Sequence, residues 1–535
     1  MDIDLRRYDE FPPVSRGDYE AAVAKALGAR TLDQLRAVTL DGIRIPPLGS
    51  PRPDRDPLAG RAVGRPWTIV QKVLLADADA ANAQILDELA GGADGVDLLF
   101  PAGSPPSAAA SGSGADLQAN LIRVFSTVHL DMIRVHLTGA SDPLAVVEAL
   151  GRVAQAAGRD ASAVRVHGGF DPLAAALVAG GDFAAAARGF DETVRRCLAA
   201  HRGEVAGSLL ASRGEVWRAL GASDLQQLAI SVASGCHSLR RWFAEGGDKA
   251  GAGRLAAAIE FRLVADQVQF VTTARLRAFR RLWALALDGF GLAQAPAFVH
   301  AETSWRMMTR RDPWVNILRT TIAAFAAAVG GADAITTVPH TAALGRPDAA
   351  ARRLSRNVQT ILMEEVNLAR VSDPAAGAGG LEDLTDRLAE GAWATFQEIE
   401  REGGIAESLA SGALTGRIAA MDARERDLAA RRRLPITGAS TYPLLSEAAA
   451  PVDPGDPLPA PAPGARRLSE PFEALRDRSD AILSSTGRRP SVFLATLGAA
   501  AAHGTRAAWA RNVLAAGGIE ASGGEPMASA EAAAE

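Results

Sequence analysis

The segments MIRVHLT (Met132–Thr138) and AVRVHGGF (Ala163–Phe170) are short runs of mostly apolar and β-branched character. Residues 139–162 between them are rich in Ala, Leu and Val, and their apolar positions have helical spacing. This order of run, helical stretch and run is typical of parallel strands that are joined by a helical crossover.

The same alternation extends over most of the 535 residues, which are too many for one ordinary domain. Eight β–α units predict an α/β fold, a closed (β/α)8 TIM barrel. An open, doubly wound sheet is the alternative. The eight expected strands are Trp67–Val73, Gly95–Phe100, Met132–Thr138, Ala163–Phe170, Glu204–Ser212, Ala257–Ala265, Ala297–Ser304 and Ala332–Pro339. The longest expected helices are Ser223–Ala244 and Gln267–Asp288.

Several expected strands carry polar residues on one face, because positions i and i+2 point the same way. The alternate positions, such as Val135, Val166 and Phe261, are apolar and suit the helix-covered outside of a barrel. The polar face is therefore expected to point inward. The candidate interior residues are Arg134, His136, Arg165, His167, Glu260, Arg262, Arg277, His300, Glu302 and Ser304.

Two explanations fit a polar barrel interior. The side chains either line a path for a polar ligand or neutralise one another as a buried plug. The residues alone do not choose between these explanations.

The barrel, residues 61–440, is expected to carry attachments at both ends. Residues 1–60 form an arm, with a helix over Tyr19–Leu27 and an extended, surface-bound stretch over Pro46–Pro57, where prolines recur. Residues 441–469 are a Pro-rich, semi-rigid linker. Residues 470–535 contain a helix near Glu470–Leu483, one strand at Pro490–Leu497 and a helix around Ala507–Ala516, which cannot close a core.

Composition and motifs exclude several classes of function. With 57 basic and 62 acidic residues the chain has no basic footprint for nucleic acid and no polybasic membrane patch. Two cysteines exclude a disulfide framework, and the eight histidines form no HExxH pair that would predict zinc. The N-terminus is unlike a secretory signal, and the longest apolar stretch, IAAFAAAV (Ile322–Val329), is too short to span a membrane. A cytoplasmic protein is expected.

Further segments are distinctive. They include TLDGIRIPPL (Thr39–Leu48), RPWTIVQ (Arg65–Gln71), ARLRAFRRLWA (Ala274–Ala284) and HAETSWRMMTRRDPWVNILRTT (His300–Thr321). In this order they resemble the adenosylcobalamin-dependent methylmalonyl-CoA mutase family. The resemblance covers residues 39–440 and implies a TIM barrel in an isomerase that interconverts (R)-methylmalonyl-CoA and succinyl-CoA. RDPWVNILRTT and GGADAITTVP look like the small (beta) subunit of the heterodimeric form.

The chain departs from the pattern of the family's catalytic chain at three places. Where that pattern has an aromatic hydroxyl after RPWTI, this chain has Lys72, and where it has a histidine, this chain has Arg218. The family's cobalamin-binding Asp-x-His-x-x-Gly element follows a strand similar to SVFLATLG. Here the ligand position falls on Ala502, with His503 one residue late and no aspartate two residues before it.

The resemblance and its departures together imply a small subunit that is not itself catalytic. They imply that the partner is a homologous large (alpha) subunit and that the arm wraps around it. Adenosylcobalamin is then expected in that partner, and no cofactor or metal is expected in this chain. The acyl-CoA substrate would be bound by the complex. Residues 470–535 would be a truncated, flavodoxin-like remnant of a cobalamin domain. The alternatives are a mutase chain that is competent or binds acyl-CoA, and a TIM-barrel protein for an unrelated polar ligand.

Overall fold

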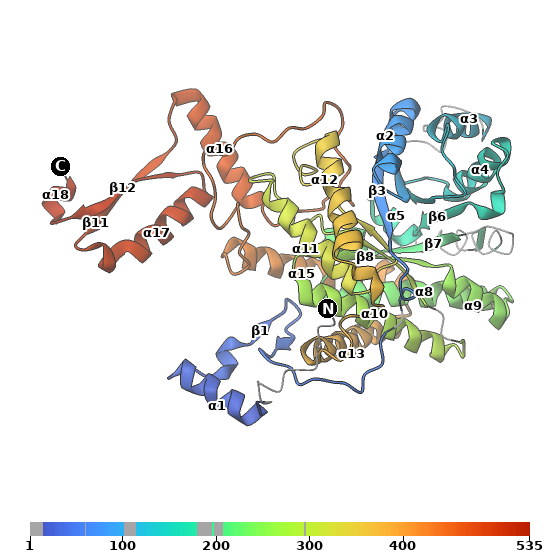
Figure 1. The fold of residues 1–535 in the computed structure, drawn as a ribbon, viewed down its shortest axis with the longest axis horizontal. Coiled ribbons are helices and arrows are strands. Elements are labelled where there is room, and N and C mark those ends of the chain that lie inside the picture. Colours follow the sequence, from blue (N-terminus) through green and yellow to red (C-terminus); the bar gives the residue numbers. More distant parts are fainter. Residues whose placement is uncertain are drawn as a thin grey trace, which may run out of the picture.

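The computed structural model describes residues 14–58, 60–100, 114–178, 195–196, 199, 207–293 and 296–534. A barrel forms the body of the molecule, and two extensions project from it (Figure 1). One extension is the N-terminal arm, and the other is a C-terminal unit of helices and two strands.

Eight parallel strands close the barrel in the order β10-β3-β4-β5-β6-β7-β8-β9. This confirms the TIM barrel and excludes the open sheet. Each strand falls within or beside its predicted range, although residues 204–206 of the fifth prediction lie outside the described residues. The strands are β3 (Thr68–Leu74), β4 (Gly95–Leu99), β5 (Arg134–Thr138), β6 (Arg165–Phe170), β7 (Gly207–Arg213), β8 (Glu260–Ala265), β9 (Phe298–Thr303) and β10 (Ala334–Thr336).

Helices cover the outside of the barrel, where the apolar alternate positions of the strands are buried. For example, the ring centroid of Phe261 lies 4.7 Å from that of Phe279 and 4.9 Å from that of Trp283. The elements around the barrel are α2 (Ala78–Ala90), α3 (Gly114–Val124), α4 (Pro143–Ala156), η2 (Ala161–Ala163), α5 (Pro172–Val178), α7 (Gly214–Ala219), α8 (Asp224–Ala244), α9 (Lys249–Ala257), α10 (Gln269–Gly289), α11 (Val315–Val329) and α12 (Ala349–Thr360).

A second set of helices follows the last strand and packs outside the first. Of these, α13 lies against both α8 and α10. The set consists of a π-helical turn η3 (Ile361–Glu365), η4 (Leu368–Arg370), α13 (Gly379–Arg401), α14 (Ile405–Ala410) and α15 (Ala413–Ala430). Within the part of the chain that the structure describes, no helix is long and apolar enough to cross a bilayer.

The arm begins with α1 (Arg16–Leu27), η1 (Leu32–Leu35) and a hairpin of β1 (Ala37–Val38) and β2 (Arg44–Ile45). Helix α1 matches its prediction and buries none of its residues. The described residues between β2 and β3 form neither helix nor strand, as the prolines predict. They cross α13 so closely that a Cβ atom on Gly379 would lie 1.7 Å from the carbonyl oxygen of Ser50.

The Pro-rich linker lies on the barrel rather than in solvent. Asp453 forms a β-bridge with Arg346, and Leu458 and Ala462 pack against buried barrel residues. The C-terminal unit follows, with α16 (Glu470–Thr486), β11 (Ser491–Leu497), α17 (Ala500–Ala516), β12 (Glu520–Met527) and α18 (Ala530–Ala534). The expectation of a single strand was wrong, because β12 pairs with β11 in parallel.

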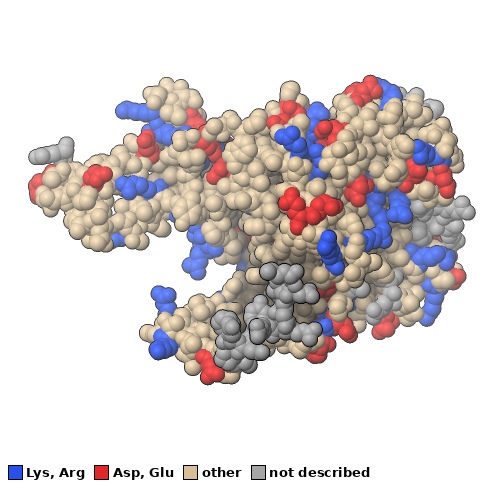
Figure 2. All heavy atoms as spheres, in the orientation of Figure 1, with Lys and Arg blue, Asp and Glu red and all other residues tan. Residues whose placement is uncertain are grey.

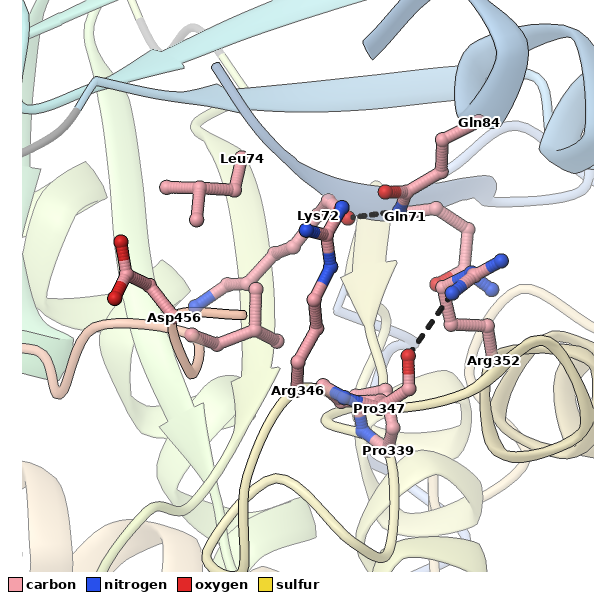
Figure 3. Close-up of a pocket in the computed structure, with 10 residues that line it drawn as sticks. Gln71, Lys72, Leu74, Gln84, Pro339, Arg346, Pro347, Arg352 and Asp456 are labelled. Atoms are coloured by element: carbon pink, nitrogen blue, oxygen red, sulfur yellow. Dashed lines mark hydrogen bonds between the residues drawn. The ribbon is translucent and has the colours of Figure 1, made fainter. Parts of the chain in front are cut away.

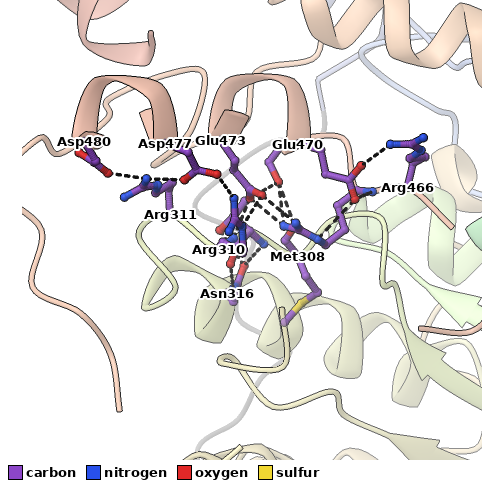
Figure 4. A network of polar contacts seen from close by, with 12 residues as sticks. Met308, Arg310, Arg311, Asn316, Arg466, Glu470, Glu473, Asp477 and Asp480 are labelled. Carbon is purple, nitrogen blue, oxygen red and sulfur yellow. Dashed lines mark hydrogen bonds and ion pairs between the residues drawn. The ribbon is translucent and has the colours of Figure 1, made fainter. Parts of the chain in front are cut away.

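Ion pairs fix α16 to the loop that follows β9 (Figure 4). Arg310 binds Glu473 through both its backbone N–H and its side chain, and Arg311 binds Asp477 and Asp480. The start of the C-terminal unit is therefore tied directly to the rim of the barrel.

Candidate functional site

Two histidines and a glutamate meet at the centre of the barrel axis. The Nδ1 atoms of His136 and His300 lie 2.8 Å and 2.9 Å from the same oxygen, Oε1 of Glu260. The Nε2 atom of His300 lies 2.8 Å from the Thr336 hydroxyl. Each imidazole donates Nδ1–H to the carboxylate, which can only accept. All four side chains are buried.

Arg262 supplies the positive charge of this cluster. Its Nε is 3.2 Å from Glu260 Oε2, and its NH1 donates to Thr138, whose hydroxyl in turn donates to Asp97. Burial acts to raise the pKa of Glu260, but Arg262 and His136 outweigh it and hold that pKa well below its usual value. Burial lowers the pKa of His136 to about 4. The cluster therefore contains the ionised carboxylates of Glu260 and Asp97, the Arg262 guanidinium and the neutral imidazole of His136.

A second group lies nearer the N-terminal ends of the strands. The His167 ring stacks on His136 at 4.4 Å and on Phe298 at 4.4 Å. His167 Nδ1 lies 2.8 Å from the Ser208 hydroxyl, and its Nε2 accepts from Arg134 at 3.3 Å. Arg165 is exposed at the mouth of the barrel. These contacts continue the column of stacked side chains along the axis.

The upper part of the axis is closed by an ion pair between Lys72 Nζ and Glu302 Oε1, 2.6 Å apart. Above Lys72 lies a cavity of about 20 Å³, and Arg346 and the linker residue Asp456 help to line it (Figure 3). That volume holds roughly one water molecule. Ser304 lies just past β9, where it is buried.

Side chains thus fill the barrel axis, and the contacts match the plug rather than the open path. Among the described residues, His136, Glu260 and His300 are the one group of three whose atoms could surround a metal ion. However, their separations are hydrogen-bond distances, and Arg262 already neutralises the carboxylate. A cation there would stand beside a buried guanidinium, so the donor set does not favour a metal.

The N-terminal mouth of the barrel is open and basic. Two neighbouring cavities of about 280 and 380 Å³ share Arg65 and Arg134 in their walls, and the larger also reaches Arg165 and Arg254. Phe298 and His167 form the floor of the larger cavity. This mouth could hold an anion. The stacked rings of Phe298 and His167 close its inner end, so the cavity does not continue along the barrel axis.

Arg218 lies at the C-terminal end of the barrel, where TIM-barrel enzymes have their catalytic groups. Its two terminal nitrogens bind the two oxygens of Glu425 at 2.8 and 2.6 Å, and Arg306 binds the same carboxylate at 2.8 Å. Burial acts to raise the pKa of Glu425, but the two guanidinium groups lower it to about 2. Arg218 forms part of the wall of a cavity of about 360 Å³, yet this ion pair holds its donors.

Arg277 does not belong to the barrel interior, where it was expected. It lies on α10 and points outward, where it binds Asp373 of the segment before α13 at 3.0 Å and Glu382 of α13 at 2.6 Å. A helix residue between the barrel and a second layer of helices cannot reach the axis. Asp373 also accepts from the backbone N–H of Leu58, so Arg277 positions a carboxylate that holds the arm.

Ala502 and His503 lie where the family resemblance expects a cobalamin ligand. Both lie in the first turn of α17, in a run of alanines that supplies no carboxylate to orient the imidazole. A ligating histidine almost always bonds a carboxylate, a backbone carbonyl or water through its other ring nitrogen, and neither ring nitrogen of His503 has a hydrogen-bond partner. The residues of this chain therefore do not fit the cofactor that the family resemblance implies.

The sequence patterns missed several members of the interior group. Asp97 and Thr336 complete the cluster, and Ser208 and Phe298 complete the lower group. Asp97 lies in the run GVDLL (Gly95–Leu99), where the period-two rule places it on the inner face, so that signal was available.

Comparison with known proteins shows which family the chain belongs to. The family model described as methylmalonyl-CoA mutase matches residues 53–479. The chain is 43% identical over 477 residues to a methylmalonyl-CoA mutase small subunit of Streptomyces virginiae, covering 88% of this chain and 73% of that protein.

Two other relatives agree with this match. A methylmalonyl-CoA mutase small subunit of Propionibacterium freudenreichii subsp. shermanii is 35% identical over 515 residues, 91% of this chain and 77% of that protein. A probable methylmalonyl-CoA mutase small subunit of Mycobacterium tuberculosis (strain H37Rv) is 48% identical over 314 residues, 58% of this chain and 49% of that protein. The chain belongs to the methylmalonyl-CoA mutase family, whose members depend on adenosylcobalamin.

Proposed function

We propose that this chain is the small subunit of a heterodimeric methylmalonyl-CoA mutase and that it supports a homologous large subunit without turning over substrate itself. In the complex, the large subunit binds adenosylcobalamin and interconverts (R)-methylmalonyl-CoA and succinyl-CoA. The three relatives described above are named small subunits, which supports the assignment.

The filled barrel axis is the observation that carries the proposal. A long acyl-CoA chain needs a continuous path to reach a buried reaction centre. Here the axis holds Glu260, its two histidine partners and Arg262, and Lys72 with Glu302 above them. Opening this path would separate buried ion pairs, which costs several kcal/mol for each unpaired charge.

The C-terminal end of the barrel also argues against turnover. A catalytic donor must be free to bind a substrate oxygen. Both terminal nitrogens of Arg218 donate hydrogen bonds to Glu425. Arg306 binds the same carboxylate, which helps to hold Arg218 in this position. The position that the family resemblance reserves for a neutral imidazole is thus occupied by a structural guanidinium.

The lack of a cobalamin site in α17 supports the placement of the cofactor in the partner. The hard chemistry of this family is supplied by the cofactor, and the protein supplies position and exclusion of water. A chain that lacks the axial ligand can still contribute to the second role by stabilising the catalytic barrel.

The arm is suited to contact that partner. Helix α1 buries none of its residues, although Tyr19, Val23 and Leu27 on one side are half-buried. Residues 52–58 are fixed to α13 by Arg55–Asp386 and to the segment before α13 by the hydrogen bond from Leu58 N–H to Asp373. The base of the arm is therefore anchored to the barrel while its tip is available to a partner. Deletion of residues 1–45 should leave a folded barrel that no longer co-purifies with the large subunit.

The test of the proposal uses three samples: the chain alone, the large subunit alone and the two co-expressed. We expect a stable complex, a corrinoid spectrum that follows the large subunit, and succinyl-CoA formation that is absent from the isolated chain. If the isolated chain binds corrinoid and forms succinyl-CoA, the proposal is wrong.

A second candidate function is acyl-CoA binding without turnover. The basic mouth with Arg65, Arg134, Arg165 and Arg254 favours it, because guanidinium groups bind phosphates strongly. Calorimetry of the isolated chain with coenzyme A tests this candidate. Binding that is lost in an Arg134→Ala and Arg165→Ala double variant would support it.

A further inference from the structure

The outward side of α11 lacks the polar character of a surface helix. Trp314, Leu318 and Ile322 follow one another at intervals of four residues and are 48%, 64% and 40% exposed. The one charged residue of α11, Arg319, points inward and is buried against Thr309, Asn316 and the carbonyl of Thr437. A helix that faces water normally presents charged or polar side chains there.

Apolar exposure continues beside α11. Ile361, Val366 and Val371 are exposed on the segment that contains η3 and η4, and η4 contacts α11. Val63, at the base of the arm, is exposed beside Gly64, whose N–H bonds to Ala369 in the same segment. Figure 1 shows α11 in the part of the barrel that faces the viewer, and Figure 2 shows acidic and basic side chains close to that position. We define the α11 patch as Trp314, Leu318, Ile322, Ile361, Val366, Val371 and Val63.

The size of the α11 patch distinguishes it from scattered surface residues. Its seven residues are each 40–72% exposed, and contiguous apolar surface on a soluble protein commonly marks an interaction site. Glu364, Glu365 and Arg370 are exposed around it and give it the polar rim that is typical of an interface.

We propose that the α11 patch is the surface on which the barrel of the homologous large mutase subunit docks. This inference rests on the proposed function and adds to it the location of the barrel–barrel contact. Two features favour this occupant. The patch is continuous at Val63 with the arm that we assign to the same partner, and its uncharged centre suits a permanent apolar contact rather than a charge-steered, transient one.

The experiment places a charge in the centre of the patch. Ile322→Arg is compared with Ile122→Arg, since Ile122 lies on α3, outside the patch, and is exposed to a similar extent at 45%. Each full-length variant and the large subunit are purified separately. Calorimetry then measures the dissociation constant of the complex that each variant forms with the large subunit. Thermal melting and circular dichroism of each isolated variant establish that it is folded.

We expect Ile322→Arg to weaken the complex at least tenfold and Ile122→Arg to leave it unchanged. Equal binding by the two variants would overturn the proposal for α11. A second variant, Leu318→Arg, provides the same test if Ile322→Arg does not fold.

Two outcomes separate the inference from the proposed function. If the wild-type chain does not bind the large subunit at all, the proposed function fails and this inference fails with it. If the wild-type chain alone forms a dimer that Ile322→Arg dissociates, while both forms bind the large subunit equally, the patch is covered by a second copy and the occupant that we propose is wrong.

Discussion

The barrel axis and the outer surface of α11 differ from an ordinary soluble barrel in opposite ways. The axis, which branched apolar side chains usually fill, holds Glu260, Arg262 and a column of imidazoles. The outer surface of α11, which should be polar, presents Trp314, Leu318 and Ile322. Most of the polar interior is paired within the barrel, although a few buried atoms, such as His136 Nε2, have no hydrogen-bond partner. The apolar side chains on the outside of α11 remain exposed, so the two regions differ in how far the chain itself covers them.

Removal of the central carboxylate should have the largest effect on stability. Glu260→Ala leaves Arg262 buried beside only the more distant Asp97, at 3.7 Å, and leaves two imidazole N–H groups without their acceptor. We expect the free energy of unfolding in urea to fall by about 3–5 kcal/mol. Glu148→Ala, which removes one partner of a surface pair with Arg152, is the control and should change little. A small effect at Glu260 would mean that the plug is not a self-contained network.

The second prediction concerns the dependence of stability on pH. Because burial holds the pKa of His136 near 4, below its unfolded value of 6.5, the folded chain binds fewer protons than the unfolded chain between these values. Stability should be fully present above pH 6.5 and decrease by about 3 kcal/mol as the pH falls toward 4. Urea unfolding at several pH values measures this. The slope should become shallower in His136→Asn and stay unchanged in the surface variant His129→Asn.

The third prediction tests the anchoring of the arm on the outside of the barrel. Gly379→Ala places a methyl group on the carbonyl of Ser50, whereas Gly380→Ala meets no atom within 4 Å. We expect Gly379→Ala to free the arm, so that limited proteolysis between residues 46 and 58 becomes faster, while the barrel melts at nearly the same temperature. Equal proteolysis of the two variants would mean that the close crossing does not hold the arm.

The fourth prediction is that two substitutions toward the family pattern do not give the chain catalytic activity. The double variant Lys72→Tyr and Arg218→His restores the residue types that the family resemblance implies at those positions. The isolated chain should still form no succinyl-CoA, because the interior cluster below and the absence of a cobalamin ligand in α17 remain. Succinyl-CoA formation by this variant, with adenosylcobalamin added, would show that only two side chains separate the chain from catalysis.

The sequence predicted the barrel well because strand and crossover patterns are local. The runs that contain Arg134 and His136, or Arg165 and His167, alternate with period two, and the structure places them side by side on β5 and β6. The inward direction of the polar face followed from the same rule. Whether that face was open or plugged depended on partners from distant strands, such as Asp97 and Thr336, which no local pattern pairs.

The failures have equally specific causes. Strand β12 has the sequence EASGGEPM, in which two glycines and a proline hide the signal of a strand. Arg277 was grouped with the interior although helix α10 turns it toward Asp373 and Glu382. The stretch IAAFAAAV was noted only as too short for a membrane, since a sequence does not reveal which side of a helix remains uncovered.

The ion pairs between α16 and the loop after β9 have a mechanical consequence. Arg310 and Arg311 hold three acidic residues of one helix, and Arg467 adds a second hold on Glu473. Rotation of α16 away from this loop would have to break the pairs that Arg310 and Arg311 form. Helix α16 should therefore move together with the barrel, without the hinge motion that a proline-rich connection ordinarily permits at this point.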